Sequence, residues 1–204
     1  MTADGFLDTL CDDNETALSR LGSSKSLYAL TGGEMDADAV LAAAADDANA
    51  AAETYGAWAD DGDVALFAEA AAAERDHYDD VTAEIGDHDA TATPAVYVYL
   101  DGLDDPVARL GGLVGASLAG KQRATQTSGF FTGEADPSTA SLFREYGSTL
   151  EARRDAAVDA LADLADDDGD WDRAADAASG AVQAAYDDYV EKLEAMGVNP
   201  KPVC

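Results

Sequence analysis

The sequence predicts an all-α protein, a bundle of about six helices in one domain. Apolar residues recur at spacings of three and four over several long segments, which is the pattern of helices that bury one face. Glycine, proline and acidic turn residues separate these segments, as expected where helices begin and end. The chain has 204 residues, of which 47% are hydrophobic. That is enough for one sizeable core and little for two.

The first half of the chain predicts three helices. The first is expected over residues 3–21, and a connector over 22–34 follows it. The second is expected over about 36–58, and its inward stripe is Leu41, Ala44, Ala48, Ala51, Tyr55 and Trp58. The third is expected over about 64–85, and its stripe is Phe67, Ala70, Glu74, His77, Tyr78, Val81 and Ile85. Because only the turn 60–63 separates the last two helices, we expect them to be antiparallel neighbours.

A long connection over 86–105 leads into the second half, and its run 96–100 predicts a short helix. The next helix, over about 106–129, has a proline in its first turn, where proline is tolerated. Its small residues Gly111, Gly115 and Ala119 repeat every fourth position, which predicts a close crossing with another helix.

The remaining segments complete the predicted bundle. After a loop over 130–137, helices are expected over about 138–165 and 171–196. The tail 198–204 is expected to be extended because it contains two prolines. The predicted single domain 1–204 therefore comprises an N-terminal helix and connector (1–35), four bundle helices (36–165), a C-terminal helix (166–197) and the tail (198–204).

The charge is extreme, with 42 acidic against 12 basic residues and a net charge of −30. Such a surface repels itself at low salt and is screened at high salt, which indicates a halophile with a salt-rich cytoplasm. The same acidity makes nucleic acid an unfavourable partner. Because acidic residues are so common here, a carboxylate counts as a candidate metal ligand only where it lies on a buried helix face.

Two further observations bear on location. Cys11 and Cys204 form no CxxC motif, so they predict two unrelated thiols in a reducing compartment rather than a metal module. The longest stretch of small apolar residues, 110–120, is too short to span a bilayer. We therefore expect a cytoplasmic protein that is not embedded in a membrane.

Glu74 and His77 are the candidate chemical centre. They are three residues apart, so they share one helix face, and their neighbours on that face are apolar. A buried carboxylate and imidazole need partners. A divalent metal is one such partner, because iron, manganese and zinc accept these ligands.

The segment 65–77, which ends in Glu74-x-x-His77, resembles the second bundle helix of rubrerythrin-type, ferritin-like proteins. The segment 55–59 resembles the end of their first helix. The resemblance implies a ferritin-like four-helix bundle, made of two antiparallel hairpins joined by a long crossover, with extra N- and C-terminal helices. It also implies that Glu74 and His77 bind metal, which is expected to be iron, with manganese or zinc as alternatives. The implied role is in oxidative or metal stress.

The sequence departs from that family where the other ligands are expected. Ala48 stands at the position of the first-helix glutamate, which leaves Asp47 and Glu53 as substitute ligands. One metal therefore fits better than two. The third helix offers Lys121, Gln122 and Arg123, and the fourth offers Glu151, Arg153 and Arg154. There is no rubredoxin domain.

These departures leave open that Glu74 and His77 are partly solvated surface residues. If they are buried, two interpretations remain. In one, a metal site with fewer ligands than a two-metal centre is formed by Glu74, His77, Asp47 and Glu53. In a variant of this interpretation, the Glu74-x-x-His77 helices of two chains complete one site across a homodimer. In the other, an arginine, Arg153 or Arg154, pairs with Glu74, and a buried ion-pair network replaces the metal. The chain is then a non-catalytic scaffold with a regulatory or interaction role. His88 is expected to be solvated in an acidic loop, and Tyr28, Tyr55, Tyr78 and Tyr189 are expected to be core residues.

Overall fold

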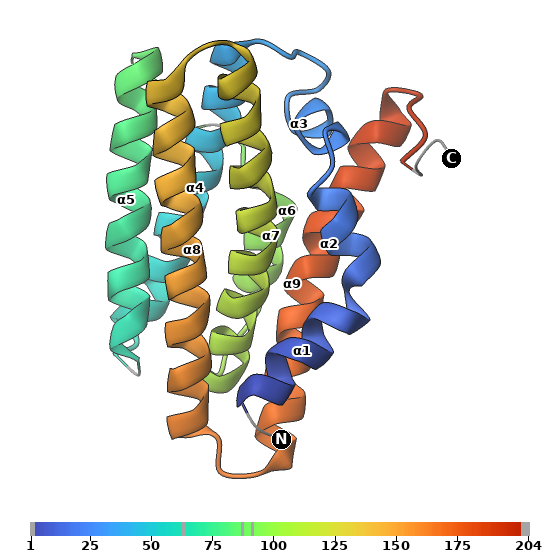
Figure 1. Ribbon diagram of the computed structural model, residues 1–204. Helices are drawn as coiled ribbons and strands as arrows, with labels where there is room; N and C mark the ends of the chain where they lie inside the picture. The colour runs from blue at the N-terminus through green and yellow to red at the C-terminus, as the bar shows by residue number, and fades with distance from the viewer. Residues whose placement is uncertain (1–2, 63, 87, 91, 201–204) are drawn as a thin grey trace.

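The computed structural model describes residues 3–62, 64–86, 88–90 and 92–200, and within that part of the chain every regular element is a helix (Figure 1). The described residues form nine helices: α1 (Ala3–Asp13), α2 (Glu15–Leu21), α3 (Lys25–Leu30), α4 (Ala37–Asp60), α5 (Ala65–Ile85), α6 (Ala95–Leu100), α7 (Pro106–Gly133), α8 (Pro137–Leu164) and α9 (Asp168–Ala195). The predicted all-α class is confirmed. No helix among these residues is both long and apolar enough to cross a membrane.

Four long helices, α4, α5, α7 and α8, run alongside one another as two hairpins, α4–α5 and α7–α8 (Figure 1). The helices within each hairpin pack closely, whereas the two hairpins approach each other less closely. Helix α9 packs along α7, and α1, α2 and α3 contact α9 in turn. The wider gap between the hairpins leaves room for long side chains.

Aspartates cap the N-termini of α4, α7, α8 and α9, whereas α5 begins after Val64 without a side-chain cap. Asp36, Asp105, Asp136 and Asp167 each accept hydrogen bonds from backbone amides in the first turn of α4, α7, α8 and α9. These bonds satisfy amides that have no partner within the helix. Some of the many acidic residues therefore define where helices start, in addition to solvating the surface.

The predicted close crossing of the small-residue helix is confirmed, and its partner is α9. A Cβ atom on Gly111 would lie 2.2 Å from the carbonyl oxygen of Ala174, and one on Gly115 would lie 2.1 Å from that of Ala178. No side chain fits at that distance, so glycine alone allows this approach of the two backbones.

Several predicted boundaries are wrong. The first helix, expected over 3–21, is two helices separated at Asn14, whose side chain bonds the backbone of Leu10 and the hydroxyl of Ser179. The connector 22–34 contains α3. The loop expected over 130–137 begins only after Gly133, because Phe131 is a core residue that extends α7 by one turn. The count of about six helices is corrected accordingly.

The core consists of two apolar clusters at different levels of the bundle. The larger includes Tyr55, Phe67, Leu113 and Leu161, and the smaller is built from Leu27, Val40, Leu41, Ala45, Val81, Phe131, Ala140 and Phe143. On each of the four long helices, a stretch without residues of either cluster separates the two levels. The polar residues described next come from these stretches.

Candidate functional site

A layer of buried polar side chains lies between the two apolar clusters. It contains Asp47 from α4, Glu74 and His77 from α5, Arg123 from α7, and Tyr146 and Arg153 from α8. Glu74, His77 and Arg153 are each exposed by 6% or less. Buried charges require partners, so the pairing of these groups decides what the layer does.

Glu74 is bound by two groups from α8. Nη1 of Arg153 forms an ion pair with Oε1 of Glu74. The hydroxyl of Tyr146 donates to Oε1 and Oε2 of Glu74 at 3.1 and 2.9 Å. The Arg153 guanidinium also lies 5.5 Å from the ring centroid of Tyr55, within the range of a cation–π interaction. Its Nη2 atom is buried and forms no hydrogen bond with any residue that the structure describes.

Asp47 forms the second pair, with Arg123. Nη2 of Arg123 lies 3.0 Å from Oδ2 and 2.9 Å from Oδ1 of Asp47, and only the contact with Oδ2 has hydrogen-bond geometry. The hydroxyl of Tyr97, from α6, donates to the same Oδ2 at 3.2 Å. Glu74 and Asp47, the two carboxylates of the layer, are therefore each held by an arginine of the α7–α8 hairpin and by a tyrosine hydroxyl.

Within each pair, the arginine and the carboxylate stabilise each other's charged form. Burial raises the pKa of Glu74 and of Asp47, while Arg153 and Arg123 act in the opposite direction. Burial lowers the pKa of Arg153 and Arg123, but the facing carboxylates outweigh it and leave both pKa values raised. With two carboxylates against two guanidiniums, the layer has no net charge that a metal ion would be needed to balance.

His77 makes ring contacts instead of hydrogen bonds. Its imidazole is stacked on Tyr146, with centroids 3.6 Å apart and planes 6° apart, and it meets the edge of Phe143 at 5.5 Å. No described residue forms a hydrogen bond or ion pair with it. Burial, and then the charge of Arg153, lowers the pKa of His77 to about 4, so the ring is neutral at pH 7.

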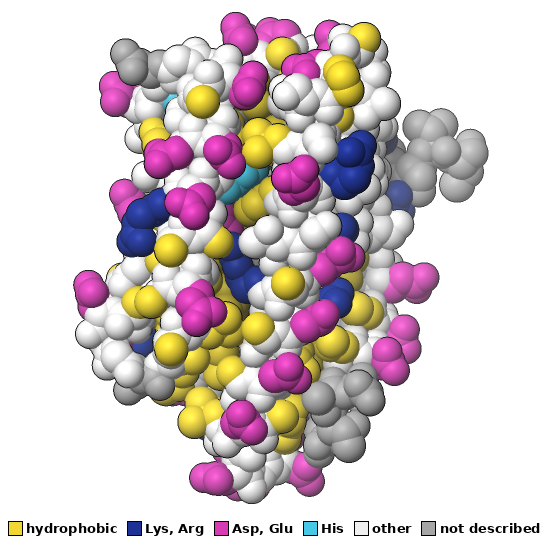
Figure 2. All heavy atoms as spheres, turned by 60° about the vertical axis from the view of Figure 1, so that its left-hand side comes forward, with side chains coloured by type: hydrophobic (Ala, Val, Ile, Leu, Met, Phe, Trp, Pro, Cys, Tyr) yellow, Lys and Arg dark blue, Asp and Glu magenta, His cyan; other side chains and the backbone are white. Residues whose placement is uncertain are grey.

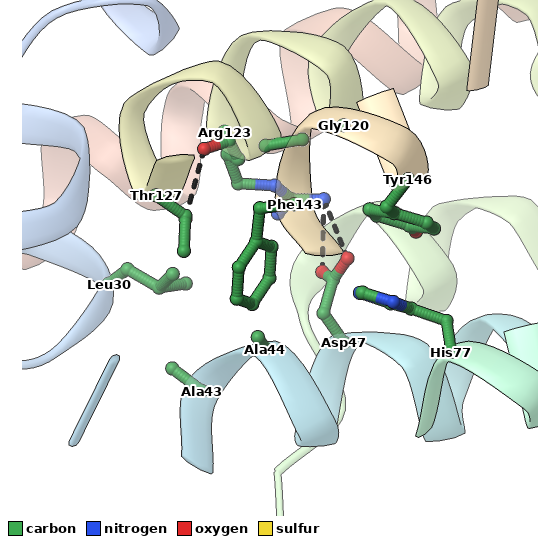
Figure 3. Close-up of a pocket in the computed structure, with 11 residues that line it drawn as sticks. Leu30, Ala43, Ala44, Asp47, His77, Gly120, Arg123, Thr127, Phe143 and Tyr146 are labelled. Carbon is green, nitrogen blue, oxygen red and sulfur yellow. Dashed lines mark hydrogen bonds and ion pairs between the residues drawn. The ribbon is translucent and has the colours of Figure 1, made fainter. Parts of the chain in front are cut away.

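A small cavity of about 30 Å³ opens beside this layer (Figure 3). Asp47, His77 and Arg123 point toward one another across it, and Phe143 and Tyr146 also line it. Its volume is that of about one water molecule, which is too small for an organic substrate. The cavity is likewise too small for an organic cofactor.

Of the predicted metal ligands, Asp47, Glu74 and His77 lie in this layer, and Glu53 does not. Glu74 and Asp47 are each committed to an arginine, and Glu53 is exposed on α4, where the side chain of Asn49 donates to it at 3.3 Å. Among the described residues, no group of three or more His, Cys, Asp or Glu side chains is placed to hold a metal ion. The residues present therefore do not fit the metal centre that the resemblance implied.

The structure decides which of the candidate cations enters the layer. Arg153, and not Arg154, pairs with Glu74, whereas Arg154 pairs with the neighbouring Asp155 at the surface. From α7 it is Arg123 that turns inward, and Lys121 binds Glu151 on the outside.

Two tyrosines of the layer were missed by the sequence interpretation. Tyr146 lies seven residues before Arg153, two turns along the same face of α8, and that spacing was a usable signal. Tyr97 comes from the short helix α6, and nothing in its local sequence indicates that it faces Asp47.

His88, expected to be solvated, is half-buried in the crossover. Its Nε2 lies 2.8 Å from Oδ1 of Asp46 on α4, and its carbonyl accepts a hydrogen bond of 2.7 Å from the hydroxyl of Tyr78 on α5. The prediction failed because Asp46 and Tyr78, far from His88 in the sequence, form its environment. Of the two cysteines, Cys11 is a free thiol and Cys204 lies outside the described residues.

Comparison of the chain with models of known protein families, with curated proteins and with solved structures finds no match.

Proposed function

We propose that this chain is a ferritin-like scaffold in which two buried arginine–carboxylate pairs stand in place of a metal centre, and that it acts by binding a partner. The observation that carries the proposal is the double pairing across the hairpins, Glu74 with Arg153 and Asp47 with Arg123. Both buried carboxylates that a metal ion would require are thus paired with arginines.

The order of the helices supports the ferritin-like part of the proposal. Two helical hairpins are joined by a connection of about twenty residues that contains α6, and the polar layer lies between them near the middle of the long helices. In ferritin-like proteins the metal ligands project inward from the same four helices. Glu74 and His77 retain the spacing of such a half-site.

The energetics support a structural role for the layer. A buried ion pair adds little net stability, but removing one partner leaves an uncompensated charge and costs about 3–5 kcal/mol. The pairs therefore penalise any arrangement of the hairpins in which the arginines miss their carboxylates. We infer that they fix the register between the hairpins, which a metal centre would otherwise do.

A second candidate is a rubrerythrin-like protein that binds one iron, manganese or zinc ion in oxidative or metal stress. The observation in its favour is His77, a buried imidazole without a hydrogen-bond partner among the described residues, which faces a cavity also lined by Asp47. For this candidate to hold, Arg123 or Arg153 must leave its carboxylate.

Elemental analysis of protein purified in molar salt separates the two candidates. The scaffold predicts no stoichiometric iron, manganese or zinc, no rise in melting temperature on adding Fe²⁺, Mn²⁺ or Zn²⁺, and peroxide turnover no faster than a blank. One metal per chain that is lost in Glu74→Ala and in His77→Ala, but kept in the His88→Ala control, would establish the second candidate and overturn the first.

A further inference from the structure

The furrow between α5 and α8 contains a cleft of about 230 Å³ on the face shown in Figure 2. Acidic side chains stand along both sides of this face, and apolar, basic and histidine side chains lie between them (Figure 2). Asp76, Asp80 and Glu145 line the cleft, together with His77, Leu142 and Tyr146.

The three carboxylates of the cleft form no ion pair with any described residue. Asp76 and Asp80 are exposed one turn apart on α5, an arrangement in which like charges repel. Neither forms an ion pair with a described residue, and Glu145, across the cleft on α8, receives only a 3.3 Å hydrogen bond from Ser141. The basic residues next to them in sequence, Arg75 and Arg144, do not line the cleft.

The inner wall of the cleft gives independent evidence that the ligand carries a hydrogen-bond donor. His77 is only 6% exposed and lines both the cleft and the inner cavity, and no described residue bonds its imidazole. A neutral imidazole has one free acceptor nitrogen. The Tyr146 ring and the Leu142 side chain beside it add an aromatic and an aliphatic surface.

We propose that this cleft binds the ammonium or guanidinium group of a lysine or arginine side chain presented by a partner protein. The aliphatic stem lies against Leu142 and Tyr146, and the charged group lies among the carboxylates of Asp76, Asp80 and Glu145. This assignment deepens the proposed scaffold function and rests on it, because it names the chemistry of the partner.

Size and geometry favour a single basic side chain. A metal ion does not suit the cleft, since no three His, Cys, Asp or Glu side chains of the described chain converge on one point. A volume of about 230 Å³ lies below the roughly 300 Å³ at which sites for drug-sized ligands begin. The furrow extends beyond the cleft along the two helices (Figure 2), which leaves space for the polypeptide that carries the side chain.

The test is an NMR titration of the full chain in molar KCl at constant ionic strength. The probes are the Nα-acetyl methylamides of lysine and arginine, with the uncharged norleucine analogue as their matched control. We expect saturable shifts of the His77 and Tyr146 ring resonances with lysine and arginine, and none with norleucine. High salt suppresses the loose accumulation of cations that the net charge alone would cause.

Variants locate the binding. Asp76→Asn/Asp80→Asn should weaken binding about tenfold, because two exposed charge pairs of about 0.7 kcal/mol each are lost. Asp159→Asn/Asp163→Asn removes the same charge at the same spacing from an exposed part of α8 and should change nothing.

Three outcomes would overturn the assignment: shifts that never saturate, equal effects of the two double variants, or equal binding of norleucine. Tighter binding of putrescine than of the lysine probe would overturn the choice of a protein partner. A flat titration of a protein that elemental analysis finds free of metal would remove this inference and leave the metal-free scaffold standing.

Discussion

Arg153 on α8 and Glu74 on α5 form an ion pair in which both side chains are almost fully buried, at the level between the two apolar clusters of the core. Residues 79 positions apart in the chain thus join the two hairpins. For Glu74 to bind a metal ion, Arg153 would have to leave its carboxylate.

Breaking this pair from one side should destabilise the protein strongly. We expect Arg153→Met to lower the free energy of unfolding by about 3–5 kcal/mol, because it leaves the Glu74 carboxylate buried without its counter-charge. Urea unfolding at high salt measures the effect. Arg154→Met is the matched control, since Arg154 pairs with Asp155 at the surface, and it should change stability by less than about 1 kcal/mol.

Neutralising both partners should restore most of that loss. In Glu74→Gln/Arg153→Met the amide oxygen of residue 74 still accepts the hydrogen bond from Tyr146, and no unpaired charge remains. The double variant is therefore expected to be more stable than Arg153→Met alone. Additive losses in the double-mutant cycle would show that the two side chains do not interact.

His77 should make stability rise as pH increases from about 4 to about 6.5. Its pKa is about 4 in the folded chain and 6.5 when unperturbed, so over this range the unfolded state binds more protons than the folded state. The contribution is fully present above pH 6.5 and amounts to about 3 kcal/mol between the two limits.

Glu74 and Asp47 also titrate in the folded protein. The contribution of His77 is therefore isolated by comparing the pH dependence of stability between the natural chain and a His77 variant. Unfolding free energies measured at pH 7 and pH 5 should show a smaller difference in His77→Phe than in the natural chain. His88→Gln serves as the control and should leave the contribution of His77 in place. An unchanged pH dependence in His77→Phe would contradict the assignment.

Alanine at the α7–α9 crossing should be destabilising despite its better helix propensity. Gly111→Ala and Gly115→Ala each place a Cβ atom against a backbone carbonyl of α9, an overpacking that costs about 1–3 kcal/mol. Gly129→Ala, on the same helix but with no atom within 4 Å of the new Cβ, should instead stabilise by about 0.5–1 kcal/mol. Thermal unfolding of the three variants compares them directly, and equal effects at all three positions would refute the close crossing.

Removing salt should lower the melting temperature. The net charge of −30 makes the folded chain repel itself, and the screening length increases from about 3 Å at 1 M salt to about 10 Å at 0.1 M. Replacing the exposed Asp159 and Asp163 by lysine should lessen the dependence on salt. A melting temperature that does not vary with KCl would show that the repulsion is unimportant.

Much of the fold depends on local sequence patterns and was therefore predictable. Helical spacing of apolar residues predicted the long helices to within a few residues, and the small residues at 111 and 115 predicted a close crossing. The errors fell where a distant residue decides the structure. Asn14 interrupts the first helix where it bonds Ser179, and Phe131 extends α7 into the smaller apolar cluster.

The sequence by itself determined that Glu74 and His77 share a buried helix face, because their spacing of three residues fixes that relation within one helix. Only the tertiary structure decided what they face. Adjacent residues such as Arg153 and Arg154 differ by about 100° around a helix, so a small rotation of α8 chooses which of them enters the core. That rotation depends on the packing of both hairpins, and it placed Arg153 on Glu74 and Arg123 on Asp47.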